Sequence, residues 1–210
     1  MNSPVKPSFI ETNLDEIASF EGKVVVFMSP TGQIGLSARR VNKLMKRSLT
    51  RLAESATFEK MPNSGCHVLS MPSGMAATDV LVVKLPKRTT IDDARLAGAN
   101  IGKLAAGAAL LILAGSEKNV TDLAFGCALR QYSFHDHKTS PAPELGDMTI
   151  MVTQPTEMTT AYAAKAAITE GVFFTRDLVN EPANVLTTTE FANRLEALKK
   201  LGMKITTLEE

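Results

Sequence analysis

The sequence lacks the features that would place it among disulfide-rich, zinc-binding, membrane or secreted proteins. It contains two cysteines, Cys66 and Cys127, which are far apart and outside any CxxC or Cys/His spacing. It therefore indicates neither a disulfide framework nor a zinc site, and we expect two buried thiols in a reducing compartment. No apolar run approaches the roughly 20 residues that span a bilayer. Residues Met1 to Ile10 lack the basic start and long apolar core of a secretory signal. These absences predict a cytoplasmic protein without a membrane partner.

An excess of charge of one sign is also missing. The chain carries 23 basic and 22 acidic residues, which gives a net charge of +1. No overall field would attract nucleic acid or an anionic membrane. Basic residues recur along one predicted helix, about Ser37 to Glu54, without aromatic side chains for base stacking. We interpret this set as a solvated helix face and do not expect nucleic acid as a partner; it comprises Arg39, Arg40, Lys43, Lys46, Arg47 and Arg51.

What the sequence does contain is a regular alternation of short apolar runs and longer segments of helical spacing. With 44% hydrophobic residues, the chain has enough apolar surface to fold as a globule. The alternation predicts an α/β fold in three layers, a sheet with helices on both faces. Four segments are predicted as strands, and two more, about 7–12 and 67–71, as edge strands; the four are 23–28, 79–85, 109–113 and 148–152.

Helices are predicted between these strands and after them. Thr90 to Asp93 has the pattern of an N-cap followed by first-turn acids, which predicts a helix to about Ala108. Another helix is expected at 120–132, and a surface loop at 138–146. The alanine-rich segment 157–178 predicts one long helix that ends before Pro182. A further helix at 187–201 and a strand at 203–208 are expected to follow.

This pattern predicts three units along the chain. Residues 1–155 form an α/β domain, 156–181 a linker helix, and 182–210 the beginning of a second α/β domain. The last predicted helix and strand have no sheet of their own to join, so the sequence has the pattern of a truncated second domain.

Three segments are candidates for ligand or metal binding. His135-Asp136-His137 has a metal-like composition, but residues two apart do not share a helix face, so a polar helix end is the preferred interpretation. Gly98 to Leu104 imitates a phosphate-binding loop, yet it lies inside a predicted helix. Its glycines are better explained as small residues that let the helix lie close to the sheet. Ser29 to Gly35 follows a strand and precedes a helix, so its amides would face an anion at the helix N-terminus.

Two further polar residues, Glu181 and Asn184, stand beside Pro182 at the predicted domain junction. Short polar side chains in such places fix the geometry by hydrogen bonding to the backbone. We therefore assign both to the junction and not to catalysis. Three scattered histidines support no Ser-His-Asp or Cys-His arrangement.

The stretch Gly171 to Thr187, GVFFTRDLVNEPANVLT, closely resembles the "RDLVNEPANxLTP" segment of leucine (cytosol) aminopeptidases. Thr188 stands where that family usually has proline. Ala128 to Thr139 is similar to the family's "Y-x-F-x-x-Y-K" segment, with His137 where tyrosine is usual. In the family, the first of these segments ends the interdomain helix and enters the catalytic domain, which is where the residues above place a helix end.

The resemblance implies a macro-domain-like, mixed-sheet fold for the N-terminal domain and a cytoplasmic homohexamer for the full-length protein. Family members hold two divalent metals, zinc, manganese or magnesium, in a C-terminal domain that hydrolyses N-terminal residues from peptides. The segments with the metal ligands resemble "GKGxTFDTGG" and "NTDAEGR", and neither occurs here. We therefore expect no catalytic, cofactor-binding or metal-binding residue in this chain, and its own catalytic domain as its partner. The alternative is a binding module for an ADP-ribose-like nucleotide or for DNA.

Overall fold

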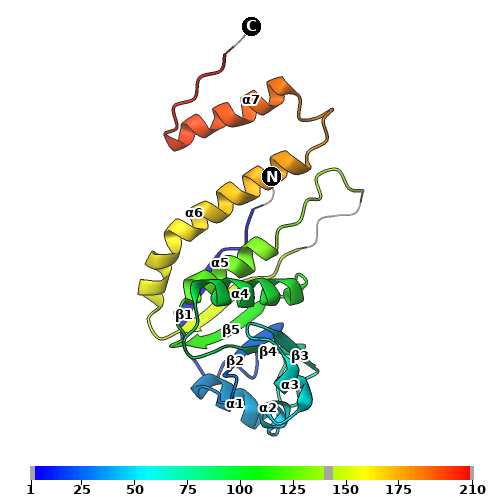
Figure 1. Cartoon of the computed structure of the whole chain (residues 1–210), viewed down its shortest axis with the longest axis vertical. Helices are drawn as coiled ribbons and strands as arrows, with labels where there is room; N and C mark the ends of the chain where they lie inside the picture. Colours follow the sequence, from blue (N-terminus) through cyan, green and yellow to red (C-terminus); the bar gives the residue numbers. More distant parts are fainter. Residues whose placement is uncertain (1–2, 140–143, 209–210) are drawn as a thin grey trace.

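A six-stranded mixed sheet forms the centre of the protein in a computed structural model, which describes residues 3–139 and 144–208. The strand order is β1-β6-β5-β2-β4-β3, and β3 alone runs antiparallel to its neighbour (Figure 1). All six strands predicted for this sheet are confirmed, including both edges. They are β1 (Pro7–Glu11), β2 (Lys23–Met28), β3 (Cys66–Ser70), β4 (Asp79–Lys84), β5 (Leu110–Gly115) and β6 (Met148–Val152).

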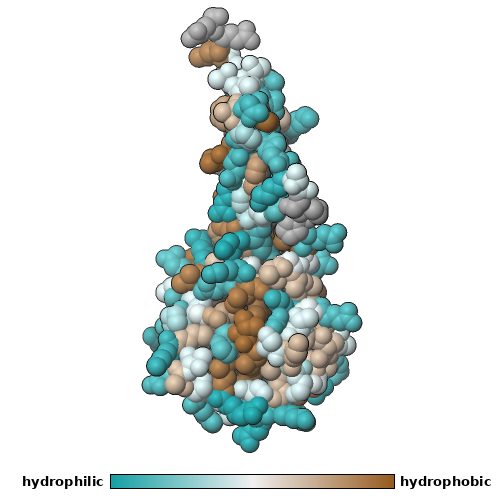
Figure 2. All heavy atoms as spheres, turned by 90° about the vertical axis from the view of Figure 1, so that its right-hand side faces the viewer, coloured by the Kyte–Doolittle hydropathy of each residue, from teal (hydrophilic) through white to brown (hydrophobic). Residues whose placement is uncertain are grey.

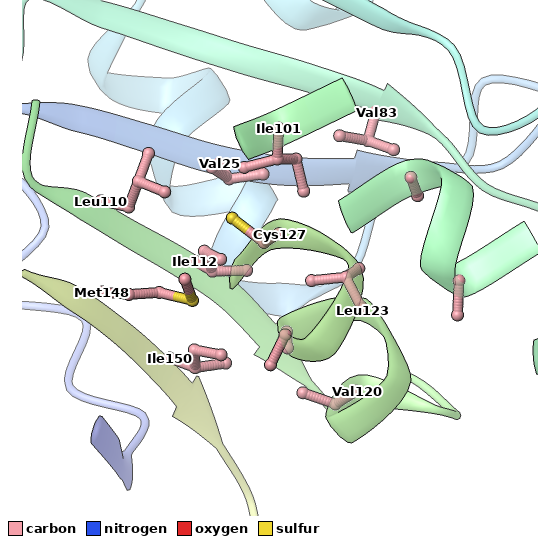
Figure 3. Packing of buried hydrophobic residues seen from close by; sticks show 14 of the residues in the cluster. Val25, Val83, Ile101, Leu110, Ile112, Val120, Leu123, Cys127, Met148 and Ile150 are labelled. Carbon is pink, nitrogen blue, oxygen red and sulfur yellow. The ribbon is translucent and has the colours of Figure 1, made fainter. Parts of the chain in front are cut away.

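Helices cover both faces of the sheet, so the predicted three layers are present. On one face lie α4 (Ile91–Ala105), α5 (Val120–Arg130) and the first part of α6 (Pro155–Asn180). On the other lie α1 (Leu36–Leu44), α2 (Ser48–Ala53) and α3 (Ala56–Lys60). Consecutive strand residues point to opposite faces. Val25 packs under α4 and α5 (Figure 3), while Val24 belongs to the core cluster on the side of α1. Because both faces are covered, the inner strands are almost continuously apolar.

The predicted basic helix 37–54 is wrong as a single element. It is broken into α1 and α2 by Lys46 and Arg47, which have φ of 49° and 68°. The Asn42 side chain accepts a hydrogen bond from the Thr50 backbone amide at 3.2 Å, and such local bonds compete with helix continuation. The break lets Leu49 reach the core. The six basic residues therefore do not follow one helix face.

The helix α4 begins with the predicted cap. Thr90 and Asp93 form a complete capping box, in which each side chain binds the other's backbone amide. The glycines of α4 were predicted to let the helix lie close to the sheet, and this prediction is wrong. Gly98 and Gly102 instead approach the backbone of α5. A Cβ atom at Gly98 would lie 1.9 Å from the carbonyl oxygen of Leu123.

The long helix expected after the α/β domain is present as α6, with 26 residues. It ends at Asn180, and Glu181 takes extended backbone angles because Pro182 follows. The next predicted helix is confirmed as α7 (Thr188–Glu196), continued by the 3₁₀ helix η1 (Ala197–Leu201). The strand predicted at 203–208 is absent, since no partner strand from the described residues lies beside them to complete a hydrogen-bonded ladder. In Figure 1, α7 lies away from the sheet, beyond the end of α6.

Candidate functional site

A crevice lies at the carboxyl ends of the parallel strands. The strands β4 and β5 pair with opposite sides of β2. The chain passes directly from β4 through α4 to β5, so the order of the strands reverses at β2. In open α/β sheets, ligands bind where the strand order reverses in this way. A cavity of about 670 Å³ lies there, and a second of about 320 Å³ shares Phe27, Gly35 and Glu117 with it. A third, of about 170 Å³, continues along the ends of β5 and β6.

The loop after β2, Ser29 to Gly35, forms one wall of this crevice. Ser29 Oγ accepts a hydrogen bond from the Gln33 amide at 3.0 Å and lies 2.9 Å from the Thr31 hydroxyl. Gly32 has φ of +79°, a conformation that glycine adopts without strain. Gly35 precedes α1, and no side chain caps the amides of the first turn of α1. The residues of this first turn, Leu36, Ser37 and Ala38, line the second cavity, and uncapped amides at a helix N-terminus are suited to an anion or a carbonyl oxygen.

Charged residues from one helix and two loops complete the crevice. Arg39 of α1 and Lys87, which follows β4, supply two cations. Glu117, which follows β5, lines all three cavities. Although its side chain is exposed, protein atoms crowd its carboxyl group, and this desolvation raises the pKa of Glu117 above its ordinary value. The crevice thus presents hydroxyl groups, free amides and charges of both signs, which can bind a polar ligand.

The other sequence candidates are not brought into this crevice. His135 Nε2 lies 2.6 Å from Ser133 Oγ, and His137 Nε2 lies 2.6 Å from Glu181 Oε2, so the two histidines have separate partners. In the described ranges, no three His, Cys, Asp or Glu side chains are grouped as metal ligands would be. The residues present therefore do not fit a two-metal centre.

The two cysteines differ in their exposure. Cys127 of α5 is fully buried, as expected, whereas Cys66 at the start of β3 is only partly buried, so the prediction of two buried thiols is wrong for Cys66. Burial raises the pKa of each thiol to about 12. Neither thiol is therefore an activated nucleophile.

Side chains hold the segment that was predicted as the domain junction. Arg194 of α7 donates to Glu181 Oε1 at 3.0 Å, and His137 contacts Oε2 of the same carboxylate. The hydrogen bond with His137 and the interaction with Arg194 lower the pKa of Glu181. The predicted backbone hydrogen bonds of Glu181 are therefore replaced by bonds to two other side chains, and Asn184 is exposed. Glu181 joins the segment after α5 to α7, through the end of α6.

A second set of contacts at this junction was not expected from the sequence. Tyr132 donates its hydroxyl proton to Asp177 Oδ1 at 3.0 Å and accepts a hydrogen bond from Asn180. Arg176 donates to the Leu129 carbonyl oxygen at 2.7 Å and stacks over the Tyr132 ring. These bonds tie the last turns of α6 to the end of α5 and to the residues that follow it. Their residues fall within the two segments that resemble the aminopeptidase family, which was the available signal.

The fold was compared with those of solved protein structures. The fold is that of a macrodomain: it resembles a Trypanosoma brucei macrodomain crystallised with ADP-ribose, with a TM-score of 0.51 and 16% identity over 79% of this chain and 74% of that one. It also resembles a tomato leucine aminopeptidase mutant, with a TM-score of 0.75 and 14% identity over 96% of this chain and 43% of that one. At these identities both likenesses show the fold alone.

The sequence comparison identifies the family. The chain is 45% identical over 203 residues to a probable cytosol aminopeptidase of Dinoroseobacter shibae, a match that covers 97% of this chain and 42% of the relative. The chain belongs to the leucine (cytosol) aminopeptidase family and corresponds to the N-terminal domain of its members. It spans less than half the length of this curated relative. A scan against models of protein families gave no match. None of the helices that the structure describes has the length and apolar character needed to cross a membrane.

Proposed function

We propose that the chain is the non-catalytic N-terminal part of an aminopeptidase that removes N-terminal residues from peptides in the cytoplasm. The observation that carries this proposal is the 45% identity to a protein named a cytosol aminopeptidase, of which the chain matches 42%. In this proposal, the unmatched part of such a protein supplies the metal ligands and the peptide-binding site. The present residues contribute a folded support and the junction that leads into the catalytic part.

The metals belong to that other part. When bound there, two divalent ions would activate a water molecule and polarise the scissile carbonyl group. This chain lacks the family's metal-binding segments, and its described carboxylates and histidines are not grouped. Its own contribution is to hold α7 in a fixed direction through Glu181 and Arg194, and to take part in the homohexamer that we propose for the full-length protein.

A chimera tests this proposal. The chain replaces the matching segment of the Dinoroseobacter shibae relative, and hydrolysis of leucine p-nitroanilide is measured with manganese or zinc. We expect turnover by the chimera and none by the chain alone, because the metal ligands lie in the added part. The relative without its matching segment is the control for what the support contributes. Metal-dependent turnover by the purified chain alone would contradict the proposal, and so would a folded, metal-loaded chimera without activity.

A second candidate function is suggested by the crevice. Its place at the reversal of strand order, its free amides and its two cations would accept an ADP-ribose-like nucleotide. Binding of duplex DNA is less favoured, because the basic residues do not share one helix face.

Calorimetric titration with ADP-ribose tests the second candidate. We expect Arg39→Ala with Lys87→Ala to weaken binding at least tenfold, since both residues line the crevice. The matched control is Lys43→Ala with Lys46→Ala, because these basic residues are exposed outside it. Loss of duplex DNA binding in the control variant, with a steep fall between about 50 and 200 mM salt, would instead identify a DNA surface.

A further inference from the structure

The strand β3 forms one edge of the sheet. It pairs with β4 along one side, from Cys66 opposite Val83 to Ser70 opposite Asp79. In the part of the chain that the structure describes, no strand pairs with its other side. Figure 2 views the side of the molecule on which β3 lies in Figure 1, and it shows an apolar strip in the middle of the α/β body. An unprotected edge of this kind is a template for pairing with another strand.

The register of β3 determines which of its backbone groups face outward. Just beyond the two ends of β3, Gly65 accepts a hydrogen bond from the Lys84 amide at 3.0 Å, and Met71 donates to the Thr78 carbonyl oxygen at 2.8 Å. Antiparallel partners alternate between bonded and non-bonded pairs. The odd-numbered residues of β3 are therefore bonded to β4. The amides and carbonyl oxygens of the even-numbered ones, Cys66, Val68 and Ser70, face away from it.

Two of the features that normally prevent pairing, charged residues and proline, are absent from β3. Natural edge strands are protected by lysine, proline, bulges or a covering loop. The five residues of β3 include no charged residue and no proline, and four of the five are partly buried. The whole stretch 61–78 contains no Asp, Glu, Lys or Arg, although at 21% charged residues about four would be expected. Depletion of charge is typical of the core of a protein interface.

The exposed methionine that follows the strand also indicates a contact surface at this edge. Met71 is 91% exposed and has φ of +51°. It is the most exposed large apolar residue among those described. A partner strand at this edge would bury part of its side chain, and methionine adapts its shape to such contacts.

We propose that the free edge of β3 is the contact surface for a second copy of this chain, which pairs through its own β3 in antiparallel orientation. The two-fold axis passes beside Val68, so that Val68 faces Val68 of the second copy and Cys66 faces Ser70 of the second copy. The two sheets then form one continuous sheet of twelve strands. This inference goes beyond the proposed function and does not depend on it.

A second copy fits this edge because the register is self-complementary. A two-fold axis at Val68 pairs each outward-facing residue with another outward-facing residue, as hydrogen-bonded pairs require. Every outward amide and carbonyl group from Cys66 to Ser70 then has a partner. An axis between two neighbouring residues would instead pair outward-facing with inward-facing groups. Because the strand is uncharged, the contact brings no like charges together.

The first test is the oligomeric state of the whole chain. Light scattering after gel filtration should give the mass of a dimer, and Val68→Pro should raise the dissociation constant at least about 100-fold, because proline removes the central outward amide and blocks the approach. The matched control is Leu69→Pro, which removes an amide bonded to β4. We expect Leu69→Pro to lower the melting temperature more than Val68→Pro does.

Disulfide cross-linking tests the register without relying on proline. The pair of Cys66 with residue 70 of the second copy has a Cα separation of about 5.5 Å, within disulfide range. Ser70→Cys should therefore give a covalent dimer with an added oxidant, and Ser70→Cys in a Cys66→Ser background should not. A wild-type chain that stays monomeric at high concentration would overturn the proposal. So would a dimer that Val68→Pro leaves intact, or a folded Ser70→Cys chain that does not cross-link.

Discussion

Replacing Gly98 by alanine is expected to lower the free energy of unfolding by at least about 3 kcal/mol, or to prevent folding. The added Cβ atom would lie 1.9 Å from the Leu123 carbonyl oxygen and 2.9 Å from the Cys127 amide nitrogen. Both atoms belong to the backbone of α5, so no side chain can rotate away. The two helices would have to separate while both remain packed on the sheet. Urea unfolding followed by circular dichroism measures the change as a lower midpoint with an unchanged slope.

The matched control is Gly171→Ala in α6. No atom lies within 4 Å of the Cβ position at Gly171, so the substitution adds helix propensity without a clash. We expect it to raise stability by about 0.5–1 kcal/mol. If Gly98→Ala unfolds at the same urea concentration as the unchanged protein, the backbones of α4 and α5 do not approach each other as closely as proposed.

These glycines show what spacing in a sequence can and cannot predict. Small residues four apart, Gly98 and Gly102, indicate that one face of a helix approaches something closely. They do not indicate whether that neighbour is a sheet or a helix, because the pattern carries no information about the partner. The partner is recognised only in the structure, where Gly126 of α5 also approaches α4 closely: a Cβ atom at Gly126 would lie 2.1 Å from the Arg95 carbonyl oxygen.

The strands were predictable because they are covered on both faces. Burial of both faces makes the runs at 23–28, 79–84 and 110–115 almost continuously apolar, which is a strong signal in a sequence. The strand predicted at 203–208, after the helix that ends at Gly202, did not form. A strand forms only with a partner, and the described residues supply none there. The break at Lys46 was missed because it depends on hydrogen bonds of one side chain, Asn42.

The crevice could be predicted only in part. The order of strand, loop and helix around Ser29 to Gly35 indicates where amides are free, and this can be read along the chain. Lys87 and Glu117 lie 52 and 82 residues beyond Gly35, and they meet it because β2 lies between β4 and β5. Strand order is a property of the whole sheet. No local pattern near Glu117 could have placed it in the site.

Replacing Asp122 by alanine is expected to have the second large effect, a loss of about 2–3 kcal/mol. Its side chain is 8% exposed and binds Arg95 of α4 at 3.0 Å and Lys165 of α6 at 3.3 Å. One carboxylate therefore joins three helices on the same face of the sheet. Without it, two cations remain beside each other at the helix interface. The loss is smaller than for a fully buried pair, because the side chains of Arg95 and Lys165 are 47% and 23% exposed and water screens them.

The pair of Glu170 with Lys6 provides the control, since it has similar geometry at the surface. Their charged atoms are 3.1 Å apart, but the two side chains are 53% and 74% exposed. Exposed pairs contribute little, so Glu170→Ala should change stability by less than about 0.5 kcal/mol. Raising the salt concentration should reduce this small effect further and leave most of the loss from Asp122→Ala in place, because a buried carboxylate is screened less. Equal losses for the two substitutions would mean that Asp122 does not hold the three helices together, and that apolar packing alone fixes their arrangement.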